Sequence, residues 1–506
     1  MRRLVIIACL VIPSRVGAQL VPVGVPSGAV RLELDGSLET FERRFLNGQR
    51  ESYAADLASP ALGGDRFPAL EDGDTRIGRI TGNTGYRINL GALGAEALAD
   101  VGTGFLGLSL GLTNRITIFG RIPLVRTRVQ PTLGLNPAAA DGGVNPGEAA
   151  QAPFFGDFDL ALTTLNNKIV AGDYDGNLAQ KALAQSTLAD ATALRADLFG
   201  LLADPATAAP FVPILSSTAG TAIDARIAAL QNTLQSSLSV PGFTTGPALP
   251  DAPVTQADLF QTLNGPLALR LGESKVTFRG DAEAGASLTL IDGWDRGTHR
   301  GGFRAAVSGL VRFPTGRVDR TDHPLDIGTG DGQTDLQVDL VTDIGSGVIG
   351  ARLNGSYVRQ LPSNLVLRVT RPSQPFVGPE RLALVRRDPG DIFAIGVQPF
   401  YRLARTLALQ AGVELWTRGT DAATYASPAD AVPGVDPSVL AEASKANATV
   451  LSVGITYANP GGLRPGGTGL PVDASWSYER VLRAGGGRVP DSHRLAGRFR
   501  VYFGLW

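Results

Sequence analysis

Hydrophobic and polar residues alternate with a period of two in many segments of this chain. Leu336, Val338 and Leu340 alternate with polar residues, and a run from 407 to 418 repeats the pattern. This period is that of a β-strand with one apolar and one polar face. Twelve segments are predicted as strands: 28–41, 103–112, 115–129, 276–291, 301–314, 335–340, 347–361, 390–403, 407–418, 446–458, 470–484 and 492–506.

The strands are joined by connections of two kinds. Thr113-Asn114, Gly345-Ser346-Gly347 and Leu403-Ala404-Arg405 are tight turns, whereas the alternate connections are long and rich in Pro, Gly and Asp. Short turns on the periplasmic side and long loops outside are typical of an outer-membrane barrel. The predicted fold is therefore all-β and transmembrane. It is an antiparallel outer-membrane β-barrel of about 12 strands, with 14 as the alternative and with an α-helical loop insertion.

The final segment is the most clearly amphipathic. Phe499, Val501 and Phe503 share one face, charged residues occupy the other, and the chain ends on the aromatic Trp506. The apolar face suits contact with outer-membrane lipid. Phe499, Val501, Phe503 and Trp506 together resemble the C-terminal signal of such barrels, so the barrel-assembly machinery is an expected partner.

The first residues predict export. Arg2 and Arg3 precede the apolar run Leu4 to Ile12, and small residues stand before Gln19. This pattern is that of a signal peptide, assigned to 1–18, which leaves 19–506 as a single barrel domain. Cys9 is the only cysteine, so its removal excludes disulfides from the mature chain. A lipoprotein signal at Cys9 is the alternative, but only eight residues precede it.

After the signal peptide, no apolar run approaches the roughly 18 residues that a membrane helix requires. A membrane-spanning mature chain must therefore cross with strands. An open sheet edge in lipid would leave backbone groups unpaired, so these strands must close into a barrel.

The segment 130–275 is predicted to be one extracellular loop insertion. Ile223, Ile227, Leu230, Leu234 and Leu238 recur at helical spacing, and residues 177–202 carry a second helical pattern. We predict a helical hairpin over about 177–240 and a short strand over 154–165. The helices either bury their apolar stripes against one another or the barrel rim, or they form a lid over the pore.

Charge and motifs argue against several functions. The net charge is −1, and removal of three arginines with the signal peptide makes it −4, so a nucleic-acid partner is not expected. Ser109 lies in a Gly-x-Ser-x-Gly sequence, but it alternates with leucines as a strand residue. The three histidines have no metal-ligand spacing. We therefore predict no catalytic residues, no metal and no cofactor.

The polar alternates of the strands are candidates for the lumen. Both signs of charge occur, so these residues either pair across neighbouring strands or form a binding ladder. The lumen-facing candidates are Arg279, Asp281, Glu283, Arg304, Arg312, Asp335, Asp339, Arg352, Glu414, Asp473, Glu479, Arg498 and Arg500.

Two segments carry a family resemblance. The sequence from Gly111 to Val125 contains Gly-Leu-Thr-Asn followed by a strand and Pro123. Farther on, Val311-Arg-Phe-Pro-Thr-Gly316 precedes Gly328-Thr-Gly330 and Asp335. Both resemble the outer-membrane transporter family linked to the meta-cleavage pathway of phenol degradation. This resemblance covers about 100–130 and 275–506, and it implies kinship with fatty-acid and aromatic-hydrocarbon channels.

The predicted function is passive uptake of small, hydrophobic or aromatic solutes through a monomeric channel in the bacterial cell outer membrane. Two alternatives stay open. An adhesin-like structural barrel requires a blocked lumen and an exposed helical loop. A barrel hydrolase requires a His beside a nucleophile at the rim.

Overall fold

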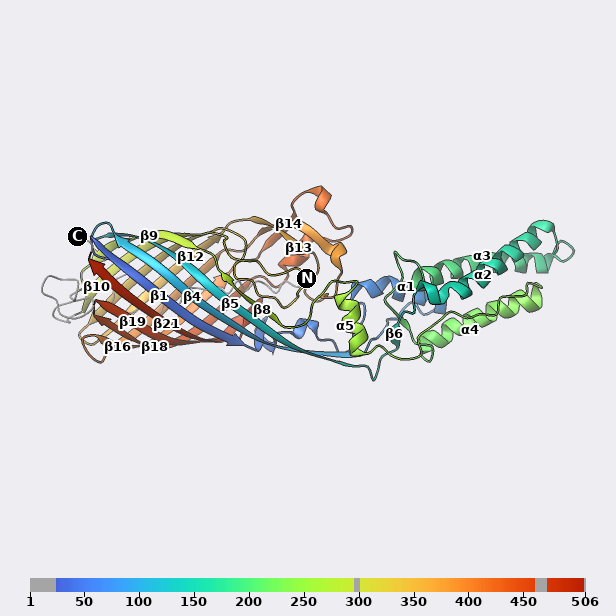
Figure 1. Ribbon diagram of the computed structural model, residues 1–506, viewed down its shortest axis with the longest axis horizontal. Coiled ribbons are helices and arrows are strands. Elements are labelled where there is room, and N and C mark those ends of the chain that lie inside the picture. Colours follow the sequence, from blue (N-terminus) through green and yellow to red (C-terminus); the bar gives the residue numbers. More distant parts are fainter. Residues whose placement is uncertain (1–23, 295–300, 460–470, 505–506) are drawn as a thin grey trace.

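The computed structural model describes residues 24–294, 301–459 and 471–504. Its main sheet is an antiparallel β-barrel in which β1 pairs with both β4 and β21, so the sheet closes on itself (Figure 1). The barrel strands are β1 (Ala29–Phe41), β4 (Ala92–Gly111), β5 (Ile116–Asn136), β9 (Glu283–Asp292), β10 (Gly301–Arg312), β11 (Asp335–Ser346), β12 (Ile349–Gln360), β15 (Ile392–Arg402), β16 (Leu407–Arg418), β18 (Ala446–Asn459), β19 (Val472–Gly485) and β21 (His493–Gly504).

These twelve strands confirm the predicted fold class and strand number. A short strand, β8 (Ser274–Arg279), precedes β9 and pairs with Leu124–Val129 of β5. No helix among the described residues is long and apolar enough to span a membrane.

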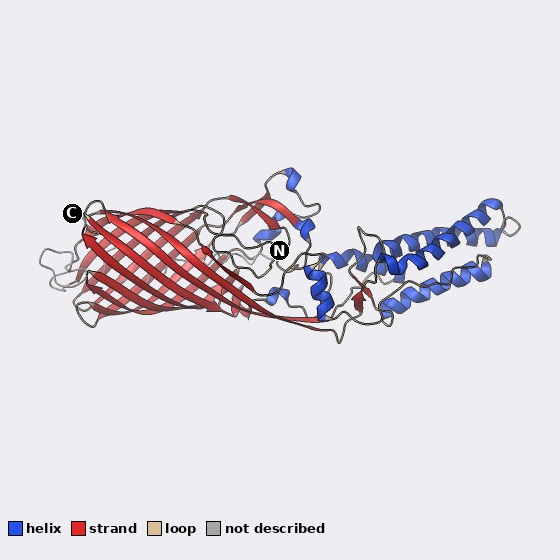
Figure 2. Ribbon diagram, in the orientation of Figure 1, coloured by secondary structure: helices blue, strands red, loops and turns tan. Residues whose placement is uncertain are grey.

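The two ends of the barrel differ. We call the end with the tight turns, near Leu112–Arg115 and Gly347–Val348, the turn end, and the opposite one the helical end (Figure 2). At the helical end lie two three-stranded sheets. They are β2 (Arg43–Leu46), β3 (Gln49–Ser52) and β20 (Arg488–Pro490), and β13 (Ser363–Arg368), β14 (Leu382–Asp388) and β17 (Ala422–Tyr425).

Strands β4 and β5 continue beyond the barrel as a two-stranded ribbon. The β1 partners of β4 end at Ala99, whereas the β4–β5 pairing runs on to Ala92 and Asn136. The ribbon leads to the small sheet of β6 (Gly142–Val144) and β7 (Phe211–Pro213) and to the helices (Figure 1).

Most of the helices extend along the long axis of the molecule, away from the barrel, whereas α5 lies close to the barrel and across that axis (Figures 1 and 2). They are α1 (Glu71–Thr81), α2 (Glu148–Ala171), α3 (Leu178–Leu202), α4 (Thr218–Asn232) with a π-helical turn (Thr233–Ser237), and α5 (Gln256–Asn264). Short 3₁₀ turns are Ala55–Leu57, Pro68–Leu70, Pro379–Arg381, Pro428–Asp430 and Pro437–Ala441.

One hydrophobic core joins these helices to the barrel's helical end. Phe158 and Leu198, from α2 and α3, are fully buried, as are Ile223 and Leu234. The same cluster includes Phe376 from a loop at the helical end. The apolar stripes therefore pack against one another and against the rim.

The predicted strand over 154–165 is wrong, because this segment lies inside α2. Phe154, Phe158, Ala161 and Leu165 are buried at spacings of four, three and four, which is the period of a helix. Pro153 is the sixth residue of α2, so the helix lacks the backbone hydrogen bond that an N–H at this position would donate to the carbonyl of Ala149.

Candidate functional site: the barrel lumen

The outer surface of the barrel is apolar. Along β18, Val453 is 55% exposed and alternates with Ser452 and Gly454, which point the other way. Large apolar side chains are exposed in the same manner on the other strands, for example Leu106 at 57% and Ile395 at 52%. A closed barrel with an apolar exterior satisfies every backbone group in hydrocarbon. The chain is a bacterial outer-membrane β-barrel.

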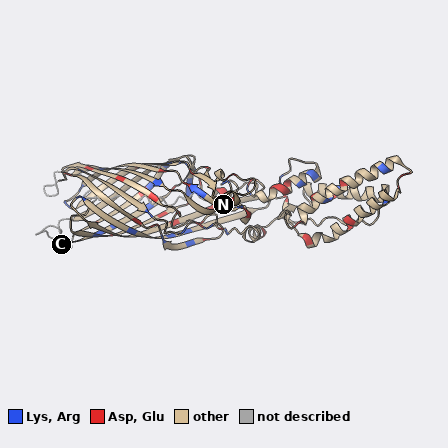
Figure 3. Ribbon diagram, turned by 90° about the horizontal axis from the view of Figure 1, so that it is seen from above, with Lys and Arg blue, Asp and Glu red and all other residues tan. Residues whose placement is uncertain are grey.

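Basic and acidic residues are spread over the barrel strands (Figure 3). On the inner face they form ion pairs that link neighbouring strands. Arg500 on β21 places Nε 2.6 Å from Asp473 Oδ1 on β19 and Nη1 3.8 Å from Glu33 Oε2 on β1. Arg498 Nε lies 2.9 Å from Asp35 Oδ1. The last strand is thereby tied to both of its neighbours, which closes the barrel with charge as well as with backbone hydrogen bonds.

A second network crosses four strands. Glu283 on β9 accepts hydrogen bonds from Arg121 on β5 and from Arg312 on β10. Arg312 Nη1 also lies 2.9 Å from Asp335 Oδ2 on β11. Glu283 and Asp335 are almost completely buried, so each carboxylate has lost its hydrating water. The paired arginines offset the free-energy cost of that loss.

A third network lies nearer the turn end. Asp343 on β11 accepts from both Arg304 and Arg352, with Arg352 Nε 2.7 Å from Oδ1. Trp294 packs beside this group, with the guanidinium carbons of Arg304 and Arg402 each 5.1 Å from its ring centre. An aromatic ring between two cations gains cation–π stabilisation from both.

Asp339 accepts from Gln337 Nε2 at 2.8 Å and from Ser308 Oγ at 3.4 Å. The other two acidic candidates on the strands have longer contacts, with Asn354 Nδ2 3.5 Å from Glu414 and Arg494 Nη1 3.9 Å from Glu479. Eleven of the thirteen candidates thus lie on barrel strands among polar neighbours of the inner face, and most of them pair across strands.

Arg279 and Asp281 are placed differently. Arg279 is exposed at the end of β8, and its Nε donates to the carbonyl of Thr315 at 3.0 Å, so it is corrected from a lumen residue to a rim residue. Asp281 is buried and accepts from the amide of Gly316 at 2.8 Å. The break between β8 and β9 interrupts the two-residue period, which is why the alternation misled at these positions.

Several inner-face residues were not among the candidates. Glu33 and Asp35 on β1 and Arg121 on β5 belong to the charge networks described above, and Arg31 Nε lies 3.6 Å from Glu33 Oε2. Their signal was present in the sequence, since they alternate with Leu32 and Leu34 or with apolar residues of 115–129.

Ser109 and the described histidines, the groups considered for catalysis, each have a different hydrogen-bond partner. Ser109 is a residue of β4 and accepts a hydrogen bond from Arg31 Nη2 at 3.1 Å. His323 Nε2 contacts the carbonyl of Gly272, and His493 Nδ1 contacts the hydroxyl of Tyr478. His299 lies outside the described residues. Within the described ranges, no group of three metal-ligating side chains occurs.

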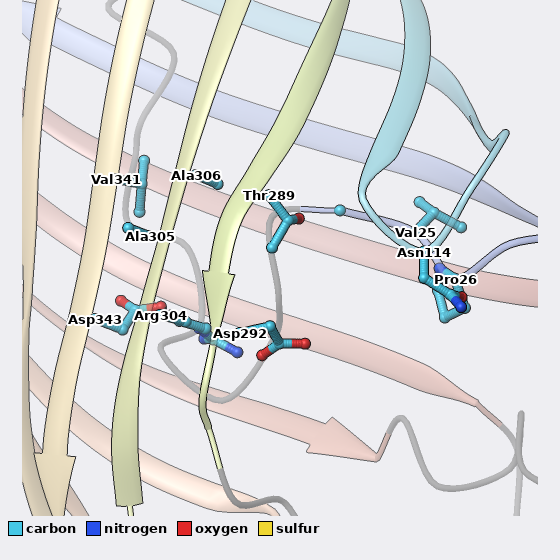
Figure 4. Close-up of a pocket in the computed structure, with 11 residues that line it drawn as sticks. Val25, Pro26, Asn114, Thr289, Asp292, Arg304, Ala305, Ala306, Val341 and Asp343 are labelled. Atoms are coloured by element: carbon cyan, nitrogen blue, oxygen red, sulfur yellow. Dashed lines mark hydrogen bonds and ion pairs between the residues drawn. The ribbon is translucent and has the colours of Figure 1, made fainter.

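A cavity of about 200 Å³ lies against the inner wall near the turn end (Figure 4). A register shift between Ala305 and Ala306 marks the strand there. Val25 fits against the same wall and donates its N–H to Thr117 Oγ1 at 2.8 Å. The cavity lining combines the apolar residues Val25, Pro26, Ala305, Ala306 and Val341 with the polar residues Asn114, Thr289, Asp292, Arg304 and Asp343.

Loops cover the mouth of the barrel at the helical end. Arg368, at the end of β13, is 1% exposed and donates to four carbonyl oxygens, those of Thr321, Leu267, Ala268 and Val377. These carbonyls belong to three separate loops. One guanidinium therefore holds the covering together, because its five donors form a rigid planar fork.

Comparisons with known proteins add little. No family model matches the chain, and no curated protein matches it. Among solved structures it is similar to an outer-membrane channel from Pseudomonas putida F1, at 11% identity and a TM-score of 0.42, covering 95% of this chain and 97% of that one. It is also similar to a FadL homologue from Pseudomonas aeruginosa, at 9% identity and a TM-score of 0.27, covering 94% and 90%. At these identities and TM-scores, the activities of the two proteins are not assigned to this chain.

Proposed function

We propose that this barrel is a passive channel for small hydrophobic or aromatic solutes and that it acts as a monomer. The turn end faces the periplasm and the helical end faces the outside, since short turns are periplasmic in such barrels. The terminal strand is the part that the barrel-assembly machinery would bind, with Trp506 outside the described residues.

The observation that carries this proposal is the cavity inside the wall. The apolar residues of its lining, which include Val25 and Val341, can pack against the ring of a small aromatic solute. Arg304 and Asp343 can bind a polar group of the same solute. Pockets for small organic molecules combine these features, a mostly apolar lining with a few placed polar groups. The family resemblance of 100–130 and 275–506 supports solutes of the same class.

The experiment is single-channel recording of the refolded protein in a planar bilayer, with and without toluene. We expect discrete current steps that toluene lowers in a concentration-dependent way. In Ala306→Phe, a ring fills the cavity, so both the current and its response to toluene should fall. A properly folded barrel without current steps would contradict the proposal.

One observation favours the adhesin-like alternative. The helices extend far beyond the barrel (Figure 1), and Val170 and Leu178, at the turn between α2 and α3, are 79% and 81% exposed. Exposed apolar side chains of this size suit contact with another surface. A barrel that conducts nothing but binds cells through this segment would support that function instead.

A further inference from the structure

One side of the lumen is largely uncharged. The ion pairs between barrel strands described above lie on β19, β21, β1, β5 and β9 to β12. The middle parts of β15, β16 and β18 carry mostly amides, hydroxyls and glycines on the inner face, with Glu414 as the charged residue among them. We call this group, together with Asn354 of β12, the amide wall. Its inner-face residues are Asn354, Gly396, Gln398, Gln410, Gly412, Ser452, Gly454 and Thr456.

The polar groups of the amide wall have unused hydrogen-bonding capacity. Neither amide atom of Gln410 has a hydrogen-bond partner among the described residues, nor have Gln398 Oε1 and Asn354 Oδ1. These side chains are 6%, 8% and 4% exposed, so bulk water does not satisfy them. Thr456 Oγ1 is also buried and has no hydrogen-bond partner among the described residues. A buried polar group without a partner costs free energy, so such a cluster points to a ligand.

Glycines set the position of each amide. A Cβ at Gly396 would lie 2.8 Å from the Asn354 amide, one at Gly412 would lie 2.7 Å from Gln398 Cγ, and one at Gly454 would lie 2.9 Å from Gln410 Nε2. Each amide side chain therefore lies flat over a glycine of the next strand. The absence of a Cβ at these glycines lets each amide pack close to the backbone of the neighbouring strand.

We propose that the amide wall is a binding site for the hydroxyl or amide group of a neutral solute. This deepens the proposed channel function and rests on it. A carboxamide offers both a donor and an acceptor, which matches a hydroxyl or amide group. A charged solute finds less here, because the neighbouring charges are already engaged: Glu414 lies 3.5 Å from Asn354 Nδ2, and Arg352, the cross-strand partner of Gln398, is paired with Asp343. The preferred solute is thus a small neutral molecule that carries one polar group on an apolar body.

The test compares benzyl alcohol with toluene, two probes with the same ring of which only the first has a hydroxyl. Single-channel current of the wild-type protein should fall saturably with benzyl alcohol and half-block at a lower concentration than with toluene. In Gln410→Leu, the half-blocking concentration of benzyl alcohol should rise roughly fivefold, as expected for the loss of one hydrogen bond. That of toluene should not change.

Ser287→Ala is the matched control, since Ser287 is a buried inner-face residue of β9, outside the amide wall. It should leave the block by benzyl alcohol as in the wild type. If Gln410→Leu fails to fold, as judged by heat-modifiable mobility, Gln398→Leu takes its place. Equal block by both probes, or unchanged block in the leucine variants, would overturn the site while the channel stands. A folded wild-type protein without any current would overturn the channel itself and the site with it.

Discussion

At the scale of single residues, Gly412 sets the space available to two inner-face side chains. A Cβ there would lie 2.6 Å from Ser452 Oγ and 2.7 Å from Gln398 Cγ, so both side chains would have to shift. We expect Gly412→Ala to lower single-channel conductance and to destabilise the barrel by about 1–3 kcal/mol. Gly309→Ala is the control, because a Cβ at Gly309 has no neighbour within 4 Å. Equal conductance in the two variants would show that Gln398 does not border the pore.

Asp74 on α1 makes the helical segment sensitive to pH. Burial raises the pKa of this carboxyl to about 6, although the Ile88 amide donates to Oδ1 at 2.8 Å. Because the folded pKa exceeds the ordinary value of 3.8, the favourable contribution is complete below pH 3.8 and is lost as the pH rises through 6. The protection factors of the α1 amides, which compare measured exchange with the intrinsic rate at the same pH, should therefore be higher at pH 4 than at pH 7.

Asp74→Asn should weaken this dependence, since an asparagine does not titrate and its oxygen can still accept from Ile88. Burial also raises the pKa of Asp141, so part of the dependence should persist. Protection factors in α1 that rise from pH 4 to pH 7 in the wild type would contradict the prediction.

At the scale of elements, Arg368 links three loops over the mouth of the barrel. Lysine keeps the charge but has no planar fork, so Arg368→Lys should lose at least one of the four carbonyl contacts. We expect faster proteolysis within 312–335 and 369–381 and a higher single-channel conductance. Arg381→Lys, at a partly exposed arginine in the same region, should change neither. Unchanged proteolysis in Arg368→Lys would show that the covering is held by its apolar contacts.

The helices should be dispensable for the barrel. The strand pairings that close the barrel include no residue between 145 and 253. Replacing 145–253 with a short Gly-Ser linker should leave heat-modifiable mobility intact, because loop length changes closure entropy only logarithmically. Helix α1 should lose protection from hydrogen exchange, since its contacts with α3 and α4 are removed. Loss of the barrel would show that the shared hydrophobic core is needed for closure.

At the scale of the whole molecule, the sequence predicted the barrel but not what covers it. Alternation such as that of Leu336, Val338 and Leu340 depends only on local geometry, so β11 could be predicted from its own residues. The acceptors of Arg368 come from loops up to about a hundred residues away, and no local pattern marks them. The amide wall was missed for a related reason, because neutral amides and glycines carry no charge signal until the strands are aligned.

The ribbon of β4 and β5, together with the helices beyond it, forms a long arm attached to the rim of the barrel. Seven residue pairs, from Ala92–Asn136 to Leu98–Gln130, extend about 23 Å beyond the β1 pairing, and the 24 residues of α2 add about 36 Å. With an arm of about 60 Å, a rotation of about 10° at the rim moves the far tip by roughly 10 Å. The converse also holds: a modest force at the tip exerts a large torque on the strands where the arm meets the barrel.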